Sequence, residues 1–182
     1  MPAMWRTKSS KVVYRNPWIS VREDEIVDPA GRDGIYGVVE IPPGVFIVAR
    51  DADARILLIE QTHYPTGRRS WELPGGGLEP GYSHEQQALE ELAEEALTAA
   101  ATLTPLGTTQ TAPGVTTELN YFMLAENLSP LSSPELAAKQ RAEGISQAAF
   151  FTDTEIRRMI REGRIDHGQT ITGYFLYLLS QD

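Results

Sequence analysis

A glycine-rich turn that runs directly into an acidic helix constrains this chain more than any other feature. Residues 75–98 read GGGLEPGYSHEQQALEELAEEALT. At about 100° of rotation per residue, one side of the helix carries the carboxylates of Glu90, Glu91, Glu94 and Glu95. The opposite side carries the apolar residues Leu89, Leu92, Ala93 and Ala96. Like charges spaced four residues apart oppose helix formation by about 0.2–0.5 kcal/mol per pair, so we expect a cation beside them.

The residues around this helix predict its ends and its ligand chemistry. Ser83 with Gln86 forms a capping box, which places the start of the helix just after Pro80–Gly81 and its end near Ala101. The glycines at 75–77 permit backbone conformations closed to other residues, so that a bare carbonyl faces the carboxylates. Carbonyl and carboxylate oxygens suit a hard cation, Mg²⁺ or Mn²⁺. The alternative interpretation is a solvated helix face, which is what most charge runs are.

Composition limits the classes of function. The chain has 182 residues, 41% of them hydrophobic, and a net charge of −9, which predicts one globular domain that binds neither nucleic acid nor an anionic membrane. The absence of cysteine excludes disulfides, Cys-ligated zinc and thiol catalysis, and fits the reducing cytoplasm. We expect neither a signal peptide nor a membrane span. His63, His84 and His167 are too scattered along the chain to predict a metal site.

The order of the expected elements predicts an α/β sandwich with a mixed sheet. Residues 18–27 and 36–41 indicate an N-terminal β-hairpin or small meander. Further strands are expected at 45–49, 56–59, 103–109, 120–124 and 148–151. Ser133 and Pro134 begin a short helix in a mobile segment that delivers Glu143, and further helices are expected at 154–162 and 169–179. Connections before residue 70 are too short for crossover helices, which excludes a regular parallel array.

The glycine-to-helix segment resembles a Nudix box, the signature of hydrolases that cleave a nucleoside diphosphate linked to another group. Anchored on Gly76, the chain supplies the box residues Glu91, Leu92, Glu94 and Glu95. It departs from the pattern at four positions, where Tyr82 replaces the first Glu, Glu90 the Arg, Leu97 the Gly and Thr98 the final aliphatic residue.

These departures differ in their expected consequences. Leu97 is expected only to let the helix continue, because the helix formers Ala99–Ala101 follow. Glu90 matters more, because the family Arg holds the metal-binding glutamates in place and a Glu repels them. Either Glu90 attracts another cation, from a second metal or from Arg68 or Arg69, or the site binds metal weakly.

Outside the box, the chain resembles the ADP-ribose pyrophosphatase branch over most of its length. The branch motifs read Trp71–Gly76 (WELPGG), then 113–118 (PGVTTE), then 143–145 (EGI), and the closing residues 161–179 also match. One departure is His63, which stands where the branch frequently has Arg.

The resemblance implies an α/β/α sandwich over residues 44–182, preceded by a β extension at 1–43 that pairs two chains as a homodimer. It implies that Mg²⁺ is held by the Gly75 carbonyl, Glu91, Glu94 and Glu95. Glu143 is the preferred general base and Glu95 the second candidate. The implied nucleotide contacts are Trp18, His63, Glu72, Pro113, Gly114 and Glu118.

Three functions follow from these residues. The first is Mg²⁺-dependent hydrolysis of ADP-ribose or a related nucleoside diphosphate sugar to a nucleoside monophosphate and a sugar phosphate. The second is a Nudix-fold protein that binds a nucleotide but has lost hydrolysis through Tyr82 and Glu90. The third, a transcriptional regulator, is disfavoured because residues 151–179 leave no room for an appended DNA-binding domain.

Overall fold

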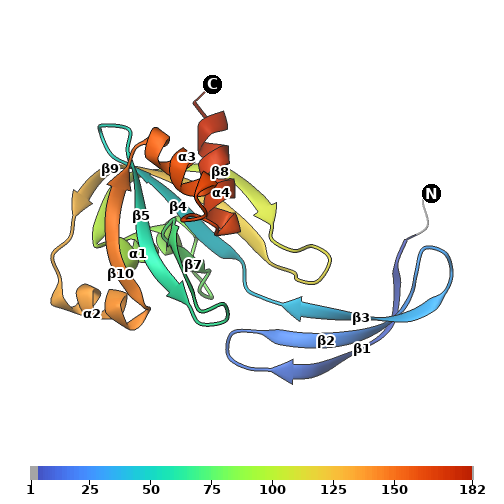
Figure 1. Ribbon diagram of the computed structural model, residues 1–182. Helices are drawn as coiled ribbons and strands as arrows, with labels where there is room; N and C mark the ends of the chain where they lie inside the picture. The colour runs from blue at the N-terminus through green and yellow to red at the C-terminus, as the bar shows by residue number, and fades with distance from the viewer. Residues whose placement is uncertain (1–3, 182) are drawn as a thin grey trace. The chain divides into compact units, whose positions relative to one another are not determined.

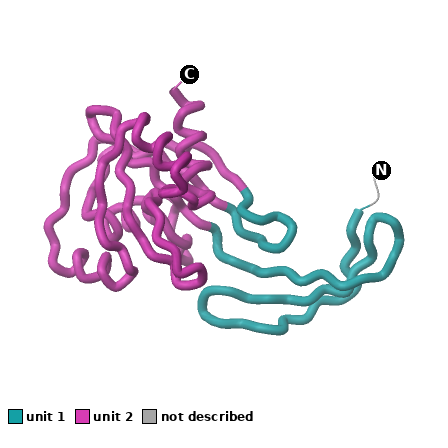
Figure 2. Tube along the Cα trace, viewed as in Figure 1, with its two compact units in different colours: residues 1–43, 110–119 teal, residues 44–109, 120–182 magenta. Residues whose placement is uncertain are grey.

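The computed structural model describes residues 4–181, which form two compact units. The first unit contains the residues up to Pro43 together with Gln110–Leu119, and the second contains Gly44–Thr109 and the residues from Asn120 onward (Figure 2).

The first unit is an antiparallel meander of three strands. They are β1 (Arg6–Arg15), β2 (Ser20–Val27) and β3 (Asp33–Glu40), in the order β1-β2-β3. The turn between β1 and β2 is closed by Asn16, whose side-chain oxygen accepts the backbone N–H groups of Trp18 and Ile19 at 2.9 and 2.8 Å. The meander was predicted, but β1 was not, because all of its side chains are exposed and its sequence lacks the polar–apolar alternation of a half-buried strand.

The second unit is built on a mixed sheet of seven strands (Figure 1). They are β4 (Gly44–Arg50), β5 (Ile56–His63), β6 (Arg68–Glu72), β7 (Gly75–Gly77), β8 (Thr98–Gln110), β9 (Leu119–Pro130) and β10 (Ile145–Phe151). The main order is β10-β5-β4-β9-β8, with β6 paired to β5 and β7 paired to β4. The parallel pairing of β4 with β9 makes the sheet mixed.

Helices cover both faces of this sheet, which confirms the predicted α/β/α sandwich. They are α1 (His84–Ala96), α2 (Pro134–Ala142), α3 (Asp153–Arg161) and α4 (Gly168–Leu179). Side chains alternate along β4, so Val45 and Ile47 pack in one core with Leu92 of α1. Val48 packs in the other core with helices α3 and α4. Within residues 4–181, no helix has both the length and the apolar character that crossing a membrane requires.

Helix α1 begins as predicted but ends five residues early. Both hydrogen bonds of the capping box between Ser83 and Gln86 are present. The prediction of an end near Ala101 is wrong, because Leu97 adopts a left-handed conformation (φ 48°, ψ 43°) and Thr98 begins β8. Leu97 therefore replaces the box glycine at a helix terminus where glycine is the favoured residue, and does not continue the helix.

The predicted separation of apolar and acidic faces on α1 is also wrong in part. Leu89 was expected on the buried side, yet it is 39% exposed, whereas Glu95 is only 3% exposed. The buried line on the helix runs through Ala88, Leu92 and Ala96, which are spaced four residues apart. Glu95 is buried because its carboxylate accepts the backbone N–H of Gly75. Helical periodicity cannot predict a hydrogen bond to another element.

Replacing Leu97 with Gly tests the cost of this helix end. A non-glycine residue in the left-handed conformation costs about 1–2 kcal/mol. We expect Leu97→Gly to be about 1 kcal/mol more stable than Leu97→Ala, because both lose the Leu side chain and only Gly lacks a Cβ. Urea unfolding followed by circular dichroism measures the difference. Equal stability of the two variants would show that the conformation is not strained.

The remaining helices confirm most of the predicted starts. Ser133 caps α2, whose first residue is Pro134, and Thr152 with Glu155 forms a capping box on α3. Strands β6 and β7 were not predicted, because five and three residues are too short to show a period. Both strands matter, since they carry Glu72 and Gly75.

Candidate active site

A cavity of about 620 Å³ in the second unit contains most of the predicted metal and catalytic residues. It is lined by residues of α1, β7, the end of α2 and the end of β5. The predicted residues on its wall are Gly75, Glu91, Glu94, Glu95, Glu143 and His63. Tyr82 and Glu90, the two main departures from the box, also line it. The cavity volume lies in the range of small-molecule sites.

Two of the three glycines of β7, Gly75 and Gly76, are required by space. Strand β7 pairs with β4, with Gly75 opposite Phe46 and Gly76 opposite Val45. A Cβ on Gly75 would lie 2.4 Å from the carbonyl oxygen of Val45, and a Cβ on Gly76 would lie 2.3 Å from Glu91 Oε1. None of the glycines at 75–77 has a positive φ, so the predicted need for an unusual backbone conformation is wrong. Close packing of the strand against β4 explains Gly75, and close packing of the Glu91 carboxylate explains Gly76.

Glu95 is the most buried carboxylate of the cavity. Its Oε2 accepts the backbone N–H of Gly75 at 2.6 Å, which joins α1 to β7. Burial raises the pKa of Glu95 well above its ordinary value, and the charge of Glu91 raises it further, while the Gly75 hydrogen bond acts in the opposite direction. The negative charge of this buried carboxylate is unfavourable by itself, so a cation bound beside Glu95 would stabilise it.

Glu91 is held by Gln87, a residue to which the sequence alone assigns no role. The side chain of Gln87 is buried, and its Nε2 donates to Glu91 Oε1 at 2.9 Å. Gln87 Oε1 accepts the backbone N–H of Glu79 at 2.8 Å, so the amide bridges the turn and the carboxylate. Burial raises the pKa of Glu91 to about 7. The separation of four residues between Gln87 and Glu91 was the available signal, because such pairs share a helix face.

Glu143 reaches the cavity from the C-terminal end of α2. Helix α2 is joined to α1, since Lys139 pairs with Glu94 and Gln140 Nε2 donates to the backbone carbonyl of Glu95 at 2.7 Å. Burial raises the pKa of Glu143, and the charge of Glu94 raises it further. The predicted short helix therefore does deliver Glu143 to the carboxylate cluster.

Glu90 has neither of the arginine partners suggested by the sequence. Arg68 pairs with Asp166 at 2.7 Å, and Arg69 lies 3.6 Å from Glu60. Glu90 instead hydrogen-bonds the hydroxyl of Tyr82, whose pKa is raised by the charge of Glu90 and by this bond. The two departures from the box are therefore in contact with each other. At these two positions the family pattern has Glu and Arg, which carry opposite charges, whereas this chain has a hydrogen bond between Tyr82 and Glu90.

The predicted nucleotide contacts fall into two groups. His63 lines the cavity, and its Nε2 lies 2.8 Å from both carboxylate oxygens of the buried Glu72. Burial raises the pKa of Glu72, and the hydrogen bond from His63 lowers it. The other predicted contacts, Trp18, Pro113, Gly114 and Glu118, belong to the first unit. Trp18 is 74% exposed there, and the Gly114 carbonyl accepts the Tyr36 hydroxyl at 2.6 Å.

The donor set of the cavity fits a hard divalent cation. Among the described residues that line it, the carboxylates are Glu79, Glu90, Glu91, Glu94, Glu95 and Glu143, and the lysine is Lys139. Lys139 pairs with Glu94. The described lining contains no further lysine or arginine that could pair with Glu91 or Glu95, and the pKa values of both carboxyl groups are raised. Oxygen ligands at this density are those that Mg²⁺ and Mn²⁺ prefer.

The raised pKa of Glu91 predicts how the metal-free protein responds to pH. An unfolded glutamate loses its proton near its ordinary pKa of 4.5, whereas folded Glu91 keeps it until about pH 7. The folded state therefore binds more protons in this window, and stability falls as pH rises. Glu91 alone should lower the free energy of unfolding by about 3 kcal/mol as the pH rises from below 4.5 to above 7.

Thermal unfolding in EDTA between pH 5 and pH 8 measures this effect. We expect the melting temperature to fall with pH, and Glu91→Gln to flatten the profile. Glu85→Gln, on the exposed side of the same helix, is the matched control and should leave the slope unchanged. A natural chain whose stability is constant across this range would contradict the raised pKa of Glu91.

Comparison with known proteins identifies the family of this chain. Residues 40–172 match the model of the NUDIX domain, and residues 5–39 match the model of the nucleoside diphosphate sugar hydrolase N-terminal domain. An ADP-ribose pyrophosphatase of Mycobacterium tuberculosis (strain ATCC 25618 / H37Rv) is 31% identical over 170 residues, which cover 93% of this chain and 81% of that protein.

Two further comparisons agree. An ADP-ribose pyrophosphatase of Bacillus subtilis (strain 168) is 30% identical over 126 residues, covering 69% of this chain and 68% of that protein. A solved structure described as an ADP compounds hydrolase superposes with a TM-score of 0.81 at 20% identity, covering 98% of this chain and 96% of that one, and shows the same fold. The chain therefore belongs to the Nudix hydrolase family, in its ADP-ribose pyrophosphatase-like branch.

Proposed function

We propose that the protein hydrolyses the diphosphate bond of ADP-ribose or a related nucleoside diphosphate sugar, with Mg²⁺ or Mn²⁺ as cofactor. The observation that carries this proposal is the convergence of Glu91, Glu95 and Glu143 on one cavity beside Gly75. The names of the two relatives, both ADP-ribose pyrophosphatases, support the choice of substrate class.

The residues of the cavity divide the work of this reaction. Glu91 and Glu95, with Glu94 and the Gly75 carbonyl, would hold the cation. When bound, the cation supplies positive charge against the diphosphate and makes a water molecule more acidic. Water oxygen attacks one phosphorus atom, and the bond from that phosphorus to the bridging oxygen breaks. The products are a nucleoside monophosphate and a sugar phosphate.

Glu143 is the proposed general base. It lines the cavity, is exposed to solvent and has a pKa above its ordinary value, and a shift in that direction strengthens a carboxylate as a base. Glu95 is the second candidate, but its Oε2 already accepts the Gly75 N–H at 2.6 Å, which suits a fixed ligand better than a base.

An activity screen with purified protein tests the proposal. The protein is incubated with Mg²⁺ and a panel that includes ADP-ribose and GDP-mannose, and the products are separated by chromatography. We expect AMP and ribose 5-phosphate from ADP-ribose. Intact substrates across the whole panel, with either Mg²⁺ or Mn²⁺, would refute the proposed hydrolysis.

The second candidate function is nucleotide binding without hydrolysis, which the Tyr82 and Glu90 departures favour. The double substitution Tyr82→Glu with Glu90→Arg distinguishes it. If the natural chain is a hydrolase, the existing hydrogen bond already positions Glu90, and an exposed ion pair in its place changes kcat/KM by less than about tenfold. If the departures have abolished turnover, the double variant gains an activity that the natural chain lacks. Steady-state kinetics with Tyr82→Phe as the control measures both.

We also propose that the protein acts as a cytoplasmic homodimer through the first unit. Its strands expose the large apolar side chains of Val12, Val13, Tyr14 and Ile35, and Trp5, just before β1, is exposed as well. Such a set on a small sheet supports burial against a second copy. Sedimentation should give twice the chain mass of 20.2 kDa, and Ile35→Asp should produce monomers, whereas Leu179→Asp in α4 should not. A monomeric natural chain would refute the dimer.

A further inference from the structure

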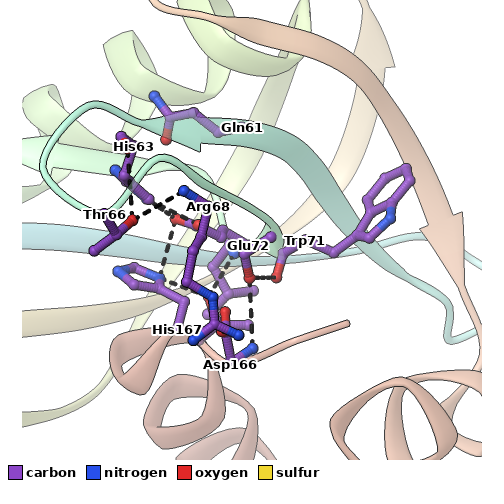
Figure 3. Close-up of polar contacts among 12 residues, drawn as sticks. Gln61, His63, Thr66, Arg68, Trp71, Glu72, Asp166 and His167 are labelled. Atoms are coloured by element: carbon purple, nitrogen blue, oxygen red, sulfur yellow. Dashed lines mark hydrogen bonds and ion pairs between the residues drawn. The ribbon is translucent and has the colours of Figure 1, made fainter. Parts of the chain in front are cut away.

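A second polar cluster borders the cavity, and the proposed hydrolysis assigns it neither a metal-binding nor a proton-transfer role. It consists of His63 at the end of β5, Glu72 at the end of β6 and His167 immediately before α4, and Figure 3 shows their side chains pointing toward one another. His63 Nε2 lies 2.8 Å from both Glu72 oxygens, and His167 Nδ1 lies 3.2 Å from Glu72 Oε2. One nitrogen or oxygen of each residue lies within 4.8 Å of the others.

We propose that His63, Glu72 and His167 bind a zinc ion. Two imidazoles with one carboxylate are a ligand set that Zn²⁺ favours, and three protein ligands leave a fourth position for water or another ligand. Mg²⁺ prefers oxygen ligands, so this site differs in chemistry from the carboxylates of α1. Binding of zinc here does not depend on the proposed hydrolytic function.

The distances are close to those that zinc requires. Ligand atoms placed tetrahedrally around zinc at about 2.0–2.2 Å lie roughly 3.3–3.5 Å from each other. The contact of 3.2 Å to Glu72 is therefore about 0.1–0.3 Å short of this separation, and the contact of 2.8 Å is about 0.5–0.7 Å short. The ligand atoms of the two histidines lie within 4.8 Å of each other.

Packing from several elements holds the three ligands in place. The His167 ring lies against Phe46, with ring centroids 5.9 Å apart, and 5.6 Å from the ring of His63. The segment before α4 is joined to β6 by the Trp71 N–H, which donates to the Arg164 carbonyl at 3.0 Å. Sites whose ligands are already positioned lose little entropy when the metal binds.

Charge in the interior also favours a cation at this position. Glu72 is only 2% exposed, and its ion pairs are with the two histidines. A buried carboxylate is costly unless positive charge compensates it, and an imidazole supplies such charge only when it is protonated. A bound Zn²⁺ would supply that charge. His63 is 40% exposed at its side chain and lines the cavity, which gives the ion a path to solvent.

Isothermal titration of the full chain with ZnCl₂, in saturating Mg²⁺ to occupy the carboxylates of α1, tests this site. We expect one zinc ion per chain. His63→Gln and His167→Gln should each weaken zinc affinity at least about tenfold. His84→Gln is the matched control, because His84 lies on α1 and stacks on Tyr121 away from the cluster, and it should leave zinc affinity unchanged.

A spectroscopic measurement keeps the test independent of activity and of folding defects. Co²⁺ in place of zinc should give the visible absorption of a four-coordinate site, and His63→Gln should abolish it. Circular dichroism verifies that each variant is folded. Zinc affinity that falls in Glu91→Gln but not in the histidine variants would overturn the proposal by placing the ion on α1. Absence of zinc binding would overturn it too, and would leave a hydrogen-bonded triad only.

Discussion

Replacing Glu95 with Gln should reduce hydrolysis at least about 10³-fold, which corresponds to about 4 kcal/mol of lost transition-state stabilisation. The substitution keeps the shape of the side chain and an oxygen that accepts the Gly75 N–H. It removes the negative charge that would bind the cation. Steady-state kinetics with ADP-ribose, over a range of Mg²⁺ concentrations, measures the effect.

Folding and chemistry can be separated in this experiment. Burial raises the pKa of Glu95, so the metal-free folded state gains nothing from its charge at neutral pH. We therefore expect Glu95→Gln to be at least as stable as the natural chain. Glu85→Gln, an exposed change on the same helix and outside the cavity, should leave activity unchanged. Full activity of Glu95→Gln would exclude Glu95 from the metal site.

Replacing Gly76 with Ala should reduce hydrolysis about 10²-fold without unfolding the protein. The new Cβ would lie 2.3 Å from Glu91 Oε1, which is the far end of a flexible side chain. The carboxylate therefore moves, and the backbone of β7 does not need to. A displacement of about 1 Å in a catalytic group is enough for a loss of this size. Kinetics and the apparent affinity for Mg²⁺ should both change.

The neighbouring glycines are the matched controls for this substitution. A Cβ on Gly77 meets no atom within 4 Å, so Gly77→Ala should retain activity and stability. A Cβ on Gly75 meets the Val45 carbonyl oxygen at 2.4 Å, so Gly75→Ala should lower stability as well as activity. Equal activity of Gly76→Ala and Gly77→Ala would show that Glu91 does not need its present position.

Local signals in the sequence predicted a large part of the second unit. The capping box of Ser83 and Gln86 specifies the start of α1 through atoms only three residues apart. The continuous apolar run of β4 indicates a strand buried on both faces, and the structure confirms it. The end of α1 was not predicted because Leu97 has a left-handed conformation that its residue type does not favour.

The candidate site was predicted where its residues share one helix. Glu91, Glu94 and Glu95 are brought together by helical spacing alone, and the family pattern then assigned their roles. The histidines show the opposite case. Their spacing along the chain does not predict a metal site, yet His63 and His167, 104 positions apart in the sequence, meet at Glu72 in the fold.

By itself, therefore, the sequence determined the α/β class, the acidic face of α1 and the branch of the family, because each is written in short-range spacing or in a motif. Only the tertiary structure decided that Tyr82 contacts Glu90, that Gly76 makes room for Glu91, and that His63 and His167 share Glu72. Spacing along a chain reports which residues lie on one face of an element. Contacts between distant segments depend on how the sheet and the helices pack, and no local sequence pattern predicts which distant residues will meet.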